Sequence, residues 1–131
     1  MDLLNCFLFV FGSMVGSFLN VLIIRIPRRE DYIFKRSNCN FCKTKIPWYN
    51  NIPLISYLLL RGKCSSCNAK ISVQYPLVEL FMGLVAVFIF PNNSSITGLY
   101  NYFFYFSIIS VFLVHFIVDL RHRILPDQLN I

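Results

Sequence analysis

Charged side chains are scarce in this chain of 131 residues. They make up 14% of it, against 56% apolar residues and a mean hydropathy of +0.61. So little charge excludes an ordinary soluble domain, in which about a quarter of the residues are charged. The apolar residues gather in runs close to the roughly 20 residues that a helix needs to cross a bilayer. The composition therefore predicts a membrane protein.

The chain also lacks internal repeats, low-complexity tracts and a basic start. The first two absences leave no sign of a repeat architecture or a disordered linker. The third argues against a cleavable signal peptide, which opens with positive charge and has a shorter apolar core. The chain opens instead with Met1-Asp2 and continues without charge from Leu3 to Ile24. We therefore expect the first apolar run to be a retained transmembrane helix.

Three apolar runs predict an all-α polytopic membrane protein. The second run begins at Pro76, which suits a first helical position, and ends before Pro91. The third has an aromatic start, where Tyr100, Tyr102 and Tyr105 are typical of an interfacial belt. The predicted organisation is as follows: transmembrane helices over 1–24, 76–91 and 99–118, a loop domain over 25–75, and a further segment over 119–131.

Positive charge is concentrated in the predicted loop domain. Residues 25–75 hold ten of the twelve cations against two acids, Glu30 and Asp31, a local net charge of +8. Lys and Arg collect on the cytoplasmic side of membranes, so the loop is predicted to be cytoplasmic and to contact anionic lipid headgroups. Because membrane helices flank it, we favour this interpretation over nucleic-acid binding. Salt-sensitive DNA binding by residues 25–75 would revive the alternative.

Two Cys-x-x-Cys pairs lie in this basic loop, Cys39/Cys42 and Cys64/Cys67, with 21 residues between them. Four thiolates at this spacing are typical of a closed, tetrahedral structural zinc site. A reducing cytosol disfavours disulfides. Each pair is followed by a lysine and an isoleucine, which suggests two similar hairpins around one ion. The alternative is four reduced thiols that only pack two turns, and a catalytic zinc would need an open ligand position.

Small and ionisable residues within the apolar runs are the next candidates. Gly12 and Gly16 are four residues apart, a spacing that lets another helix approach closely, although small residues facing lipid are an equal alternative. Asn20 needs a polar partner at the inner interface. Glu79 is an intramembrane acid, and Arg25, Arg61 or a neighbour at the same inner interface is its natural partner. A structural role for Glu79 is favoured over catalysis.

Asp119 stands at the predicted inner end of the third span, and Asp127 follows eight residues later. A boundary carboxylate can have its proton affinity tuned by desolvation or by a neighbouring charge. Two carboxylates that share a proton across one water hydrolyse peptides without metal. A solvated helix end or an arginine partner is the plainer interpretation of Asp119.

Several ordered motifs resemble those of the bacterial type IV prepilin peptidases, and together they cover essentially the whole chain. The motifs are Gly16-Ser17-Phe18-Leu19-Asn20-Val21 with Arg25-Ile26-Pro27, the cysteine loop with Ile46 to Pro53 and Leu60 to Cys64, Ile71 to Glu79, and Asp119 to Asp127 with its Leu-Pro-Asp.

The resemblance implies an aspartic endopeptidase of the bacterial inner membrane. Such enzymes remove the leader of prepilins and pseudopilins at the cytoplasmic face, and many then methylate the new N-terminus with S-adenosylmethionine. Asp119 matches the first catalytic aspartate, so residues 119–131 match the start of the peptidase catalytic region, here truncated. Asp127 matches an acid not usually assigned a catalytic role. The four cysteines match the cytoplasmic domain that holds zinc in some members.

One departure from the family pattern is large. The family's second catalytic aspartate lies in a Gly-x-Gly-Asp motif, which is absent from this sequence. We therefore expect the 131-residue chain to be inactive alone, either as a fragment or as one half that awaits a second polypeptide. A rival hypothesis is a non-enzymatic membrane zinc module that docks pilins or secretion partners. It predicts that Asp119→Asn is silent and that loss of Cys39 or Cys64 abolishes binding.

Overall fold

The computed structural model describes residues 2–29, 39, 42–47, 49, 52–93 and 95–124, without the side chains of His122 and Ile124. These residues form α1 (Leu3–Arg25), α2 (Ile55–Leu59), α3 (Gln74–Phe88) and α4 (Ile96–Ile124), and no β-strand. The prediction of a helical fold is confirmed.

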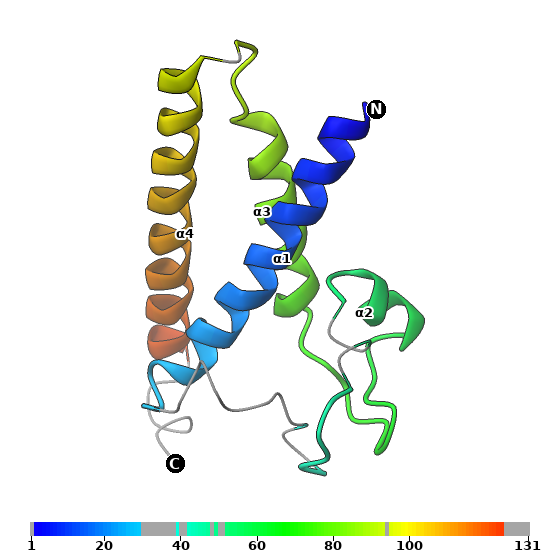
Figure 1. The fold of residues 1–131 in the computed structure, drawn as a ribbon. Helices are drawn as coiled ribbons and strands as arrows, with labels where there is room; N and C mark the ends of the chain where they lie inside the picture. The colour runs from blue at the N-terminus through cyan, green and yellow to red at the C-terminus, as the bar shows by residue number, and fades with distance from the viewer. Residues whose placement is uncertain are drawn as a thin grey trace.

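The three longer helices lie side by side, and the chain runs along α1, back along α3 and forward again along α4 (Figure 1). The last turn of α1, the first turn of α3 and the last turn of α4 therefore share one end of the assembly. Helix α2 and the cysteine hairpins lie at this same end, beside α3 (Figure 1). We call it the loop end.

Two helices, α1 and α4, are long and apolar enough to cross a bilayer, whereas the prediction of a third span is wrong by this criterion. Helix α3 has 15 residues. At 1.5 Å per residue it is about 22 Å long, less than the roughly 30 Å of a hydrocarbon core. It ends at Phe88 because Pro91 favours extended backbone before it, so the last residues of the predicted span are not helical. It begins at Gln74, which places Pro76 in the first turn, where a missing N–H costs nothing.

Helix α3 packs mainly on α1, and glycines make this contact possible. A Cβ atom on Gly12 would collide with the carbonyl oxygen of Met82 and would lie 2.6 Å from the Cβ of Ala86. A Cβ on Gly16 would lie 2.8 Å from the Cα of Glu79. Both glycines thus let the two backbones touch, which confirms the close-approach interpretation over the lipid-facing one.

Replacing Gly12 by valine is expected to destabilise the helix pair by about 1–3 kcal/mol, because the added carbons must push the two backbones apart. The measurement is the thermal unfolding midpoint of the purified chain in detergent. Gly98→Val is the matched control, since a Cβ on this helical glycine meets no described atom closer than 3.0 Å. Equal midpoints for the two variants would contradict the packing argument.

Helix α4 touches the pair through one face and leaves the rest of its apolar surface open. Its inner face contributes Phe106, which joins the buried cluster around Met82, and Tyr102, whose hydroxyl donates to the carbonyl oxygen of Ala86 at 3.1 Å. Tyr102 is thus a core residue, unlike the exposed Tyr100 and Tyr105, with which it was expected to form an interfacial belt. Only 11% of the apolar window of α4 is buried, as expected of a helix that faces lipid.

Candidate metal centre and membrane-boundary carboxylates

The two Cys-x-x-Cys segments fold into equivalent hairpins. In the first, the amide of Cys39 donates to the carbonyl of Thr44 at 3.1 Å, and the amide of Lys43 donates back to Cys39 at 3.0 Å. In the second, the amide of Cys64 donates to the carbonyl five residues later at 2.8 Å, and that of Asn68 donates back to Cys64 at 3.0 Å. The sequence repetition thus corresponds to a repeated backbone geometry.

Each hairpin turns through a residue with left-handed backbone, immediately after its second cysteine. The residue is Lys43 in the first hairpin, with φ of 54°, and Asn68 in the second, with φ of 56°. Asparagine adopts this conformation readily, whereas lysine does so at a cost. The turn brings both sulfurs of each pair to one side of the backbone.

The four sulfur atoms of Cys39, Cys42, Cys64 and Cys67 all lie within 4.8 Å of one another. The Sγ atoms of Cys39 and Cys67 are 3.6 Å apart, too far for a disulfide bond of about 2.05 Å. In a tetrahedron with Zn–S bonds of about 2.3 Å, neighbouring sulfurs are about 3.8 Å apart. The donor set and its spacing therefore fit one tetrahedral zinc ion.

Local hydrogen bonds shift the acidity of the sulfurs. The Thr44 hydroxyl and the Thr44 amide lower the pKa of the Cys42 thiol to about 6. The backbone amide of Cys67 is the first of several donors that lower the pKa of Cys64. The Ala69 amide acts in the same direction on Cys67, but desolvation and hydrogen bonds with the other three thiols outweigh it and raise the pKa of Cys67 to about 11. A bound cation would have to displace the protons that remain.

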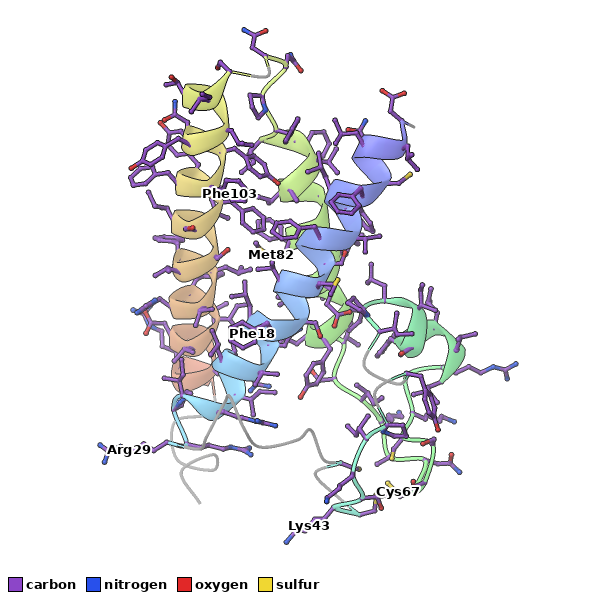
Figure 2. The ribbon with its side chains drawn as sticks, viewed as in Figure 1. Phe18, Arg29, Lys43, Cys67, Met82 and Phe103 are labelled. Carbon is purple, nitrogen blue, oxygen red and sulfur yellow. The ribbon has the colours of Figure 1, made fainter. Side chains whose placement is uncertain are left out.

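The second hairpin is joined to α2 through a tight contact at Gly62. Its φ of 69° favours glycine, and a Cβ there would lie 2.9 Å from the Tyr57 hydroxyl oxygen. The amide of Gly62 donates to the carbonyl of Tyr57, and the carbonyl of Gly62 accepts from Ile71 at 2.7 Å. This contact places the hairpin directly below α2, as Figure 2 shows for the labelled Cys67.

Glu79 is 7% exposed, and its described hydrogen bonds come from neutral groups. Its Oε2 accepts from the backbone amide of Leu54 at 2.7 Å, and the side chain of Ser17 also hydrogen-bonds to it. An amide and a hydroxyl are thus the described partners of Glu79, and its pairing with a guanidinium stays a prediction. Arg25 is itself buried in the last turn of α1, where a cation is favoured by the helix dipole.

Sequence reasoning did not identify Ser17 and Leu54 as neighbours of Glu79. It did anticipate that Asn20 needs a polar partner, and this is confirmed. The Asn20 side chain is 1% exposed, and its Nδ2 donates to the carbonyl of Tyr75 at 3.1 Å. The sequence held one clue to the Ser17 contact. Ser17 directly follows Gly16, where α1 and α3 approach closely, and this approach brings the Ser17 side chain to Glu79.

Asp119 lies exposed on the last part of α4, at the loop end (Figure 1). The structure thus places it at the same end of the helices as the four cysteines. Asp127, the other predicted carboxylate, lies outside the described residues. The pairing of these two acids stays a prediction.

Fold and site together define a helical protein of membrane type that carries a four-cysteine metal-binding unit at one end of its helices. The sequence comparisons name the family. Residues 10–92 match the family model described as "Bacterial Peptidase A24 N-terminal domain". The chain therefore belongs to the prepilin leader peptidase/N-methyltransferase family, of which it contains the N-terminal domain.

Individual relatives agree with this result, and each is named "Prepilin leader peptidase/N-methyltransferase". The chain is 41% identical to that of Myxococcus xanthus over 95% of its own length and 36% of the relative. It is 37% identical to that of Vibrio cholerae over 99% of its length and 54% of the relative. The chain thus spans about a third to a half of these relatives. No solved structure matches it.

Proposed function

We propose that this chain acts as the N-terminal part of a prepilin leader peptidase in the bacterial inner membrane. The names of the relatives support a leader-cutting activity on prepilins, and the local net charge of +8 supports a cytoplasmic loop end. The observation that carries the proposal is that the cysteine unit and Asp119 share one end of the helices (Figure 1). A prepilin leader is cytoplasmic and continues into a membrane helix, so its scissile bond would lie at this level.

In the proposed mechanism, Asp119 is one of two carboxylates that share a proton across a bound water. One carboxylate removes a proton from the water as it attacks the peptide carbonyl, and the other donates a proton to the leaving nitrogen. The partner carboxylate would come from another part of the whole protein or from a second polypeptide. Methylation with S-adenosylmethionine is the second activity that the family name implies, and we assign no residue of this chain to it.

Zinc is proposed as a structural ion. Cys39, Cys42, Cys64 and Cys67 would hold it, and four protein ligands leave no open position for a substrate. When bound, the ion would offset two of the four thiolate charges and lock the two hairpins together. The hairpins would thereby keep one fixed arrangement at the loop end.

The test is a chimera in which this chain replaces the matching N-terminal part of the Vibrio cholerae relative. We expect the chimera to remove the leader of a prepilin in a strain that lacks the native relative, as seen from the shift in pilin mass. A chimera that is stably inserted and zinc-loaded, yet leaves the prepilin uncut, would contradict the proposal.

One observation favours a second candidate, a non-enzymatic zinc module that docks pilins or secretion partners. Within the described part of the chain, all four metal ligands are present. In contrast, Asp119 is the one described acid exposed at the loop end, since Glu79 is buried and Asp2 lies at the opposite end. For this function, prepilin capture by the purified chain should survive Asp119→Asn and be lost with Cys64→Ser.

A further inference from the structure

Helix α2 presents an apolar face that no other described part of the chain covers. Ile55, Leu58 and Leu59 are 56%, 74% and 78% exposed. They belong to an uncharged stretch of the sequence that extends from Ile46 to Leu60 and ends at Arg61. A short apolar stretch of this kind, flanked by charge, is typical of an interfacial or re-entrant membrane segment.

The turn before α2 is attached part-way along the membrane helices. Leu54 is hydrogen-bonded to Glu79, in the second turn of α3, and Glu79 in turn contacts Ser17 of α1. Ser17 precedes Arg25, the end of α1, by eight residues, or about 12 Å of helix. Figure 1 shows α2 beside the lower turns of α3, with the hairpins lying further out. The turn at Leu54 therefore lies closer to the middle of the membrane helices than Arg25 does.

The backbone of this turn explains why an acid is present at such a depth. Leu54 has φ of 60° and ψ of −50°, and the amide of Ile55 donates to the carbonyl of Pro53 at 2.6 Å across this tight turn. The Leu54 amide points to Glu79 instead of to a backbone carbonyl. An unbonded amide and an unbonded carboxylate are each costly in an apolar medium. One hydrogen bond of 2.7 Å gives each group a partner.

Several further backbone amides of the segment are hydrogen-bonded, as an apolar medium requires. The amides of Ser56, Leu58 and Leu60 donate to carbonyls four residues earlier in the same segment at 2.9–3.2 Å. The Ser56 hydroxyl donates to the carbonyl of Tyr49 at 2.8 Å. The exposed side chains of α2 are those of Ile55, Leu58 and Leu59.

We propose that residues 52–60 form a re-entrant wedge that lies among the lipid acyl chains and is anchored by Glu79. The lipid-covered face of the wedge would add to the exposed apolar surface of α1 and α3, where Phe18 and Leu77 are 48% and 58% exposed. Arg61 would then reach the headgroups at the edge of the wedge. The proposal assigns the exposed leucines to lipid, and a protein partner on the same face is the competing outcome.

Tryptophan fluorescence in vesicles tests the wedge. In a Trp48→Phe background, which removes the single native tryptophan, Leu58→Trp is introduced and the full chain is reconstituted in phosphatidylcholine and phosphatidylglycerol with brominated acyl chains. We expect quenching as strong as that of Phe112→Trp, a 72% exposed position on α4. Lys70→Trp, in the second hairpin, is the aqueous reference.

Two results would overturn the proposal. Emission of Leu58→Trp that matches Lys70→Trp and is quenched by iodide would place α2 in water. Blue-shifted emission that neither bromine nor iodide quenches would mean that protein covers the leucines. Neither readout involves leader cleavage, so failure here is distinct from failure of the proposed function.

The role of Glu79 is tested in the same background. Glu79→Ala removes the acceptor for the Leu54 amide and is expected to lower bromine quenching of Leu58→Trp, whereas Glu79→Gln keeps an acceptor oxygen and should retain it. Circular dichroism checks that both variants remain helical. Unchanged quenching in a helical Glu79→Ala variant would refute the anchoring role of Glu79. If that variant fails to fold, loss of quenching in a helical Glu79→Gln variant would refute it instead.

Discussion

Replacing Asp119 by asparagine is expected to lower leader cleavage by the chimera about 10²–10⁴-fold, the range that a positioned acid or base contributes. Asparagine keeps the size of the side chain but cannot accept or donate the proton that water attack requires. Because Asp119 is exposed near the end of α4, the substitution should leave the fold unchanged. The effect should appear in kcat, measured with a purified prepilin, while KM stays near that of the parent.

Asp2→Asn is the matched control, because this residue precedes α1 at the end opposite to the cysteines (Figure 1). It should cleave at the parental rate. Full activity of the Asp119→Asn chimera would remove Asp119 from the mechanism and favour the docking function. The family resemblance would then extend to the fold and the cysteine unit but not to the chemistry of this carboxylate.

Loss of one cysteine of the site is the second large effect that we expect. The purified chain should contain one zinc ion, and Cys64→Ser should reduce its zinc affinity by more than the 10–100-fold that loss of an outer-shell partner costs. Because structural zinc supplies folding free energy, the hairpins should lose their protection from proteolysis while α1, α3 and α4 stay helical. Metal analysis and limited trypsin digestion at the loop lysines measure the two effects.

Cys6→Ser serves as the control, since Cys6 lies on α1 outside the sulfur cluster. Zinc affinity should also fall as the pH falls, because protons compete for the thiolates. The raised pKa of Cys67, about 11, means that this thiol must lose its proton on binding. Proton release measured by calorimetry in buffers of different ionisation enthalpy checks this. Unaltered zinc content in Cys64→Ser would exclude the four-cysteine site.

The cysteine unit was predictable because the residues that determine its geometry are close together in the sequence. The Cys-x-x-Cys spacing determines where two sulfurs stand, and a hairpin needs only five or six residues to close. The α1–α3 contact was half predictable. Gly12 and Gly16 indicate a close neighbour, but nothing in their spacing says which helix it is.

Other features depended on tertiary contacts that no local pattern encodes. The bounds of α3 were placed two to three residues too late, at 76–91 against Gln74–Phe88, because the apolar residues continue to Phe90. Glu79 was matched to an arginine on grounds of charge. Its described partners are the side chain of Ser17 and the amide of Leu54, and this amide becomes available only because the backbone turns sharply at that residue. Tyr102 was grouped with its exposed neighbours because periodicity alone did not identify the face of α4 that meets α3.

The two hairpins share one geometry but differ in the residue that occupies the left-handed position. Asn68 tolerates it, whereas Lys43 holds it against a preference of roughly 1 kcal/mol or more. The halves of the metal site are therefore unequal in intrinsic backbone cost. On dissociation of the ion, the half built on Cys39 and Cys42 is expected to unravel first. The half that continues into Gly62 and α2 would remain as the template on which the site reassembles.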